Sequence, residues 1–195
     1  PYVFVRGNHD SLAIEAAVAD EPNTVVLDGG AEEVAGLRIW GIGDPRYTPD
    51  KEQGGDTENE RDRIEAFAPE ASESLAAAEP PAVDVALIHD PRGAADMGGR
   101  VPLVLAGHTH EASRDVIGDN EDTLVLTQGS TGGAGLRGLQ GEEPEPLEAS
   151  VLYFDEDTHM LVAYDQVTVQ GLGQTGVTIE RHVVSDFSED DDGDS

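Results

Sequence analysis

Short apolar segments separated by polar ones run through most of this chain, and their lengths are those of β-strands. Two of them, 83–88 and 101–106, are apolar almost throughout, with Asp84 as their one charged residue, which is typical of strands buried on both faces. Shorter segments predict further strands at 2–5, 25–27, 37–42 and 124–127. Several strands with few helices between them favour a layered α/β or α+β domain.

Two segments have the composition of helices. Residues 11–20 contain Ala, Leu and Ile, and Ser11 is placed to cap the first turn. An alanine-rich segment between about 58 and 78 predicts a longer helix, which Pro69 breaks or kinks. Both helices lie between predicted strands, as in α/β folds.

The last third of the chain is less regular. Strands predicted at 150–154 and 160–169 flank an Asp-Glu-Asp-Thr turn as a hairpin, and a last strand is predicted at 177–184. The acidic end, 188–195, has almost nothing to bury and is expected to be disordered. We therefore expect one α/β domain over residues 1–187, followed by an acidic tail.

The chain is strongly acidic, with 41 acidic against 11 basic residues and a formal net charge of -30. A field of this sign repels nucleic acid, so nucleic-acid binding is disfavoured, and a phosphate ester would need bound cations to attract it. Solubility or adaptation to salt is the interpretation of the acidity that we favour. Because cysteine is absent, any metal would have to be held by His, Asp, Glu or Asn.

The sequence starts at Pro1, at the edge of the apolar segment 2–5, without an initiator Met or a signal peptide. We interpret it as a fragment that begins inside a domain. A targeting sequence or a membrane anchor ahead of Pro1 stays open, and the sequence determines neither the localisation nor the oligomeric state.

Three polar clusters each follow an apolar strand: Gly7-Asn8-His9-Asp10, His89-Asp90-Pro91 and Gly107-His108-Thr109-His110. Ligand sites in α/β sheets gather at the carboxyl ends of strands, so the three clusters are expected to converge. In an extended segment, residues two apart point the same way, so His108 and His110 are expected to face one site. By composition alone, Gly-Asn-His-Asp is expected about 0.0015 times in such a chain. Neutral imidazoles in this arrangement suit zinc, manganese or iron.

These residues resemble the calcineurin-like metallophosphoesterase family, whose ordered elements are Asp-x-His, Gly-Asp-x-x-Asp, Gly-Asn-His-Asp/Glu, a single His and Gly-His-x-His. The last three elements occur here in that order, between Gly7 and His110. The resemblance implies a layered α/β/β/α sandwich and two divalent metal ions, which could be Mn, Fe, Zn or Mg. It further implies hydrolysis of phosphomonoesters or phosphodiesters by a hydroxide held between the two metals.

The resemblance also implies a role for each residue. Asn8, His89 and His108 would bind the second metal, and His110 would bind the first. His9 would stabilise charge in the transition state and protonate the leaving oxygen, with Asp10 orienting its ring.

The first two family elements should lie upstream of Gly7, where this sequence has six residues. They would supply the bridging Asp and the rest of the first metal's ligands, so we expect this fragment alone to be inactive or nearly so. Segments 118–122 and 157–159 match these elements by letter but in reversed order. In a chain this acidic, about 0.3 and 0.6 such matches arise by chance, so neither is assigned a role.

Other residues near the motifs have plainer interpretations. Asp90 either positions its neighbours or caps a loop, and Arg46 is expected to face solvent rather than a substrate phosphate. His159 and His182 are expected at the surface. The glycine-rich run from Gly129 lacks the Gly-Lys-Ser/Thr ending of a nucleotide-binding loop, so a structural turn is expected.

Two other classes of protein stay open. One is a non-catalytic metal-binding or interaction module. The other is a different histidine-rich metallohydrolase, acting on an amide or a lactone. The His-x-His-x-Asp-His string of metallo-β-lactamases is absent, since Glu111-Ala112 follows His110.

Overall fold

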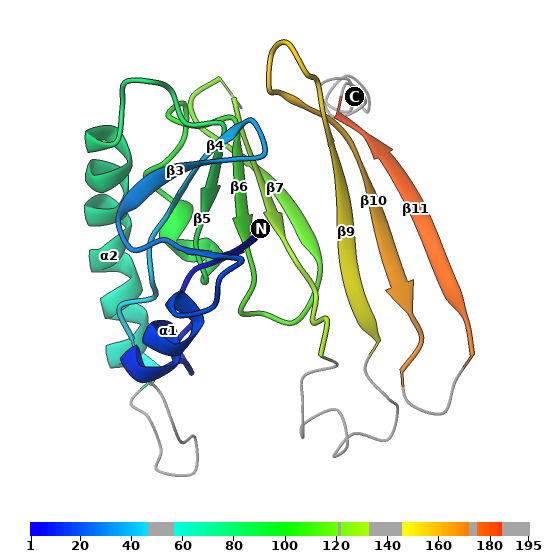
Figure 1. Ribbon diagram of the computed structural model, residues 1–195, viewed down its shortest axis with the longest axis horizontal. Helices are drawn as coiled ribbons and strands as arrows, with labels where there is room; N and C mark the ends of the chain where they lie inside the picture. The colour runs from blue at the N-terminus through cyan, green and yellow to red at the C-terminus, as the bar shows by residue number, and fades with distance from the viewer. Residues whose placement is uncertain (47–56, 121, 133–145, 172–174, 185–195) are drawn as a thin grey trace, which may run out of the picture. The chain divides into compact units, whose positions relative to one another are not determined.

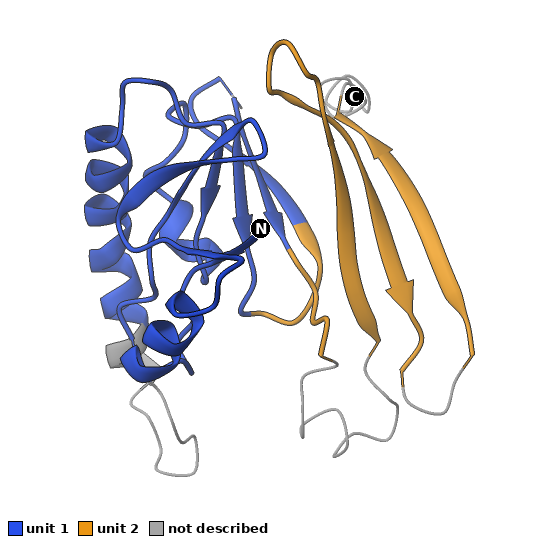
Figure 2. Ribbon diagram, in the orientation of Figure 1, with its two compact units in different colours: residues 1–108, 114–127 blue, residues 109–113, 128–195 orange. Residues whose placement is uncertain are grey.

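The computed structural model describes residues 1–46, 57–120, 122–132, 146–171 and 175–184. The chain divides into two compact units (Figure 2), of which the first contains residues 1–108 and 114–127 and the second residues 109–113 and 128–195. Among the described residues, no helix has the length and hydrophobicity needed to span a membrane. The predicted acidic tail, 188–195, lies outside the described residues.

A six-stranded mixed sheet forms the centre of the first unit (Figure 1), in the order β3-β4-β5-β6-β8-β7. Its strands are β3 (Gly30–Val34), β4 (Leu37–Gly41), β5 (Val85–Leu87), β6 (Leu103–Ala106), β7 (Ser113–Ile117) and β8 (Thr123–Thr127). The pairs β4-β5, β5-β6 and β6-β8 are parallel, whereas β3 and β4 form an antiparallel hairpin. The predicted α/β class is therefore confirmed, and the sandwich arrangement of its layers stays a prediction.

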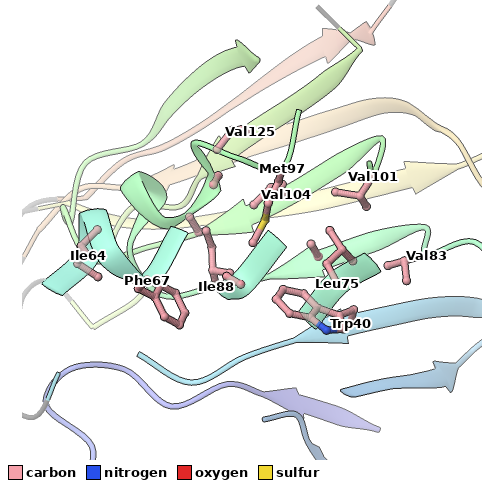
Figure 3. Close-up of a cluster of buried hydrophobic side chains, with 14 residues drawn as sticks. Trp40, Ile64, Phe67, Leu75, Val83, Ile88, Met97, Val101, Val104 and Val125 are labelled. Carbon is pink, nitrogen blue, oxygen red and sulfur yellow. The ribbon is translucent and has the colours of Figure 1, made fainter. Parts of the chain in front are cut away.

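Helix α2 (Thr57–Ala77) covers one face of this sheet and buries one stripe of its surface (Figure 3). The buried positions follow the helical repeat: Ile64, Phe67, Ala68, Ala71 and Leu75. All of these except Ala68 pack in one cluster with Trp40 and Val104 of the sheet, and Trp40 is completely buried. Pro69 lies inside the helix on its exposed side, so of the two expected effects, a break or a kink, the break does not occur.

Strands β1 (Tyr2–Phe4) and β2 (Thr24–Val26) form a parallel pair that is joined by helix α1 (Leu12–Ala19). Ser11 caps α1 as expected, because its hydroxyl accepts a hydrogen bond from the Ile14 amide at 3.2 Å. The chain just after β1 lies against β4: a Cβ added at Gly41 would come within 2.6 Å of Val5 Cγ1. Only glycine allows this approach, which brings the end of β1 to the end of β4.

The second unit contains the antiparallel sheet β11-β10-β9, built from β9 (Leu147–Phe154), β10 (Leu161–Val169) and β11 (Val177–Val183). The predicted hairpin and last strand are thereby confirmed, and segment 157–159 lies at the hairpin turn. Asp165 on β10 accepts hydrogen bonds from both Arg181 and Tyr153 on the neighbouring strands. His182 is half-buried and stacks on Tyr164, rather than lying free at the surface.

Strands β3 and β7 were missed by the sequence pattern. Their sequences, Gly-Ala-Glu-Glu-Val and Ser-Arg-Asp-Val-Ile, contain charged residues where alternation with apolar ones would be expected. Both are the outermost strands of the six-stranded sheet. Edge strands commonly carry charges that discourage pairing with other chains, and this weakens the hydrophobic signal.

Candidate metal site

Four strands of the first unit lead into loops that carry the polar motifs. The loop after β1 is joined to the loop after β4, because the Asp44 amide donates to the Arg6 carbonyl at 2.8 Å. The loop after β5 is joined to the loop after β6 by the Gly107 amide, which donates to the His89 carbonyl at 2.9 Å. Backbone bonds thus hold the carboxyl ends of these strands in two fixed pairs, as expected for a site in an α/β sheet.

The side chains of Asn8, His89 and His108 meet at these strand ends. His89 Nε2 lies 2.9 Å from Asn8 Oδ1, and His108 Nδ1 lies 3.3 Å from His89 Nε2. Asn8 is almost completely buried, and both imidazoles are half-buried. The expected convergence of the three motifs is therefore realised for these three residues.

Two separations among these three atoms are compatible with ligands of a single metal ion. Atoms that bind one ion at about 2.0–2.2 Å in tetrahedral or octahedral geometry lie about 3.0–3.5 Å apart. The two measured separations, 2.9 and 3.3 Å, are close to that range. An amide oxygen and two imidazole nitrogens are also chemically competent ligands for zinc, manganese or iron.

Burial keeps both imidazoles in their neutral form. Desolvation lowers the pKa of His108 to about 4 despite the opposing charge of Asp90. Desolvation likewise lowers the pKa of His89 below its ordinary value. Neutral imidazole is the form that binds a metal, so at neutral pH neither side chain has to lose a proton first.

Gly7 leaves the space that the His89 ring occupies. A Cβ at position 7 would lie 3.0 Å from both His89 Nδ1 and His89 Cε1, and 3.3 Å from Asp10 Oδ2. The Gly7 amide also donates to Asp10 Oδ2 at 2.9 Å, which fixes the backbone here. The glycine of the first motif is thus explained by close packing against a residue of the second motif.

Gly7→Ala should therefore weaken metal binding by pushing the His89 ring away from Asn8. We expect about a 10-fold or greater loss in Mn²⁺ affinity by calorimetric titration, comparable to losing a residue that supports a ligand. Gly30→Ala is the matched control, since a Cβ at Gly30 would meet no atom within 4 Å. Equal affinities for the two variants would contradict this account.

A network of buried ion pairs lies beside His108. The Arg46 guanidinium binds both Asp44, at 2.6 Å, and Asp90, at 2.8 Å, and its side chain is 0% exposed. The expectation that Arg46 faces solvent is therefore wrong. Burial acts to lower the pKa of Arg46, but its bonds to Asp44 and Asp90 raise it above its ordinary value.

Asp90 combines the two roles that the sequence left open. Its carboxylate caps the 3₁₀ helix η2 (Pro91–Ala94) by accepting from the Arg92 amide at 3.0 Å, and it also binds the Arg46 side chain. Burial acts to raise its pKa, but hydrogen bonds from Arg92 and nearby positive charge lower the pKa to about 2. At neutral pH, Asp90 is thus a fully ionised carboxylate beside His108.

The loop that carries Gly-His-x-His is not extended. His108 and His110 both have left-handed backbone conformations, with φ of 71° and 66°. The extended segment expected for this motif is therefore wrong, and whether the two side chains face one site stays a prediction. Non-glycine residues in this conformation cost about 1–2 kcal/mol each, and such strain is concentrated at functional sites.

The three motifs contain three further residues with expected roles: His9, Asp10 and His110. His9 is exposed next to the buried Asn8, and the Asp10 carboxylate accepts a hydrogen bond from the Gly7 amide. His110 is exposed and belongs to the second unit. Their expected roles, as proton donor, as the residue that orients it and as ligand of the first metal, stay predictions.

Within the described residues, no group of three or more His, Asp or Glu side chains is arranged to hold a metal ion. The cluster at the strand ends instead consists of two imidazoles and one amide. Asp119, in the segment that matches a family element by letter, is exposed after β7. Asp44 was missed as a neighbour of the site, and Arg46 was expected to face solvent, although both lie in the loop after β4, at the strand ends where such sites form.

No protein-family model matches the sequence, and no curated protein is significantly similar to it. Among solved structures, a hypothetical protein from Thermus thermophilus resembles the chain with 18% identity. The alignment covers 91% of this chain and 73% of that protein, with a TM-score of 0.36. A likeness at this level bears on neither fold nor function, so the function has to be inferred from the side chains at the strand ends.

Proposed function

We propose that this protein is a metal-dependent hydrolase of phosphomonoesters or phosphodiesters, of the calcineurin-like kind. The observation that supports it best is the meeting of Asn8, His89 and His108 at ligand spacing. These residues come from three separate motifs, and the motifs occur in the family order. A chance arrangement would have to satisfy both the order along the chain and the geometry.

Each residue has a separate task in this proposal. Asn8, His89 and His108 hold one metal ion, and His110 contributes to the other. When bound, the two ions supply positive charge for the phosphate oxygens and acidify a water that can attack phosphorus. His9 donates a proton to the leaving oxygen, and its exposure beside the buried Asn8 leaves it accessible to a substrate.

The proposal also includes the finer fold: a sandwich of two sheets with helices on the outer faces. Helix α2 on one face of the six-stranded sheet agrees with one outer layer of such a sandwich. The proposed substrates are small or macromolecular phosphate esters other than nucleic acid. The net charge of -30 would oppose their approach, so the metals are needed for binding as well as for reaction.

His9→Ala tests catalysis separately from metal binding. We expect it to lower kcat for a chromogenic phosphate ester by about 100-fold or more, because general acid catalysis contributes 10²–10⁴-fold. Mn²⁺ affinity should stay unchanged, because His9 is not a metal ligand in this scheme. Mn²⁺ affinity should be measured on this chain, and kcat on a longer chain that includes the first two family elements ahead of Gly7, because those elements would supply the remaining ligands of the first metal.

His159→Ala is the control, because this histidine lies at the β9-β10 turn and is in none of the three motifs that were assigned a role. Metal binding without hydrolysis in every form of the protein would favour a non-catalytic metal-binding module. Hydrolysis of lactams or lactones in preference to phosphate esters would favour another metallohydrolase. Phosphatase activity that His9→Ala leaves intact would contradict the role of His9.

A further inference from the structure

The two nitrogens of the His108 ring face different partners. Nδ1 lies 3.3 Å from His89 Nε2, on the side of the proposed metal, and Nε2 lies 3.5 Å from Asp90 Oδ2. A neutral imidazole carries its hydrogen on only one nitrogen, and the other keeps a lone pair. The group that faces Nε2 therefore influences which nitrogen carries the hydrogen, and with it whether the Nδ1 lone pair can bind a metal.

Asp90 is suited to determine the tautomer of His108 because hydrogen bonds fix the position of its own carboxylate. Oδ2 accepts from Arg46 Nη2 at 2.8 Å and from Arg92 Nη2 at 2.6 Å. Oδ1 accepts from Arg92 Nε and from the Arg92 amide, both at 3.0 Å. The Asp90 side chain is only 2% exposed, so water competes little for these oxygens.

We propose that Asp90 is a positioning residue of the metal site, which attracts the hydrogen of His108 to Nε2 and so keeps the Nδ1 lone pair directed toward Asn8 and His89. This role rests on the function proposed above. A carboxylate that fixes the tautomer and orientation of a ligating histidine is a general device of metal sites. Arg46 and Arg92 act one step further away, since they hold the carboxylate in place.

The charges beside the site support this assignment. Asp44 and Asp90 are balanced by Arg46 and Arg92, so the group as a whole is close to neutral. A neutral network can hold an acceptor for His108 without adding net charge beside the metal. A free carboxylate would instead be a competing ligand for the ion.

The test is Asp90→Asn, which keeps the shape of the side chain but places an amide where the carboxylate was. Long-range ¹H–¹⁵N NMR spectra of the metal-free chain report which ring nitrogen of His108 carries the hydrogen. We expect Nε2–H in the native chain and a mixture of tautomers in Asp90→Asn. Mn²⁺ affinity, measured by calorimetry, should fall about 10–100-fold.

Asp165→Asn is the matched control, because Asp165 is also held by an arginine, Arg181, at 2.7 Å. It should leave both the His108 tautomer and the Mn²⁺ affinity unchanged. A native chain with its hydrogen on Nδ1 would overturn the proposal. An Asp90→Asn protein with the native tautomer and the native affinity would do the same.

Arg92→Gln provides a second test if Asp90→Asn does not fold. The Arg92 side chain is half exposed, and its loss leaves the Arg46–Asp90 ion pair in place. We expect the same two changes with smaller amplitude, and native values in this variant would overturn the proposal. A native chain that binds neither Mn²⁺ nor Zn²⁺, but whose tautomer shifts in Asp90→Asn, would reject the proposed function while upholding the control of His108 by Asp90.

Discussion

Arg46→Ala should destabilise the first unit by about 3–5 kcal/mol, because it removes the partner of two buried carboxylates. The Arg46 side chain is 0% exposed, and those of Asp44 and Asp90 are 1% and 2% exposed. Asp90 would keep Arg92, but Asp44 would lose its bidentate partner in a place that water barely reaches. In a chain of this size the expected loss in Tm is about 6–20 °C.

Arg61→Ala is the control for this prediction. Arg61 also pairs with a carboxylate, that of Glu65 at 2.7 Å, but the two side chains are 72% and 59% exposed. Exposed pairs four residues apart on a helix contribute about 0.3–0.5 kcal/mol. Thermal and urea unfolding followed by circular dichroism would compare the two variants. Similar small losses in both would mean that the buried network contributes little to stability.

His89→Ala should reduce Mn²⁺ or Zn²⁺ affinity by about 100-fold or more, because residues that merely support a ligand already contribute about 10–100-fold. His89 Nε2 lies within 3.3 Å of both Asn8 Oδ1 and His108 Nδ1, so it is the central atom of the cluster. Without His89, only Asn8 and His108 remain of the three proposed ligands of this metal. Calorimetric titration of the metal-free chain measures the change.

His182→Ala is the control, because His182 is also a half-buried imidazole, stacked on Tyr164 in the second unit. The chain contains 41 acidic residues, which attract divalent ions unspecifically at low ionic strength. The titration should therefore contain about 0.15 M salt, which screens exposed charges. Equal metal affinity in the two variants would remove the cluster at the strand ends from consideration as a metal site.

The elements that the sequence predicted well are those with a strong local pattern. Strands β5 and β6 are continuous apolar segments, and Ser11 stands directly before an alanine-rich helix. The edge strands β3 and β7 lack such a pattern, because the position at the edge permits charged residues. Pro69 was expected to break or kink α2, but the packing of the helix on the sheet keeps it unbroken through this residue.

The residues of the candidate site also divide into those that a sequence motif indicated and those that only the structure revealed. The motifs pointed to Asn8, His89 and His108, and the order of the strands brings these residues together although 81 positions separate Asn8 from His89. The neighbours of the site were less visible. Arg46 reaches Asp90 across 44 positions, and no feature near Arg46 in the sequence distinguishes a buried arginine from an exposed one.

The sequence by itself determined the alternation of strands and helices, the strongly acidic composition and the kinds of side chain available for chemistry. The strands and helices depend on residues a few positions apart, whose burial follows the repeat of a strand or a helix. Only the tertiary structure decided that His108 stands between His89 and Asp90, and that Arg46 is buried beside them. The pairing of parallel strands sets such contacts, and residues that the pairing makes neighbours carry no shared pattern along the chain.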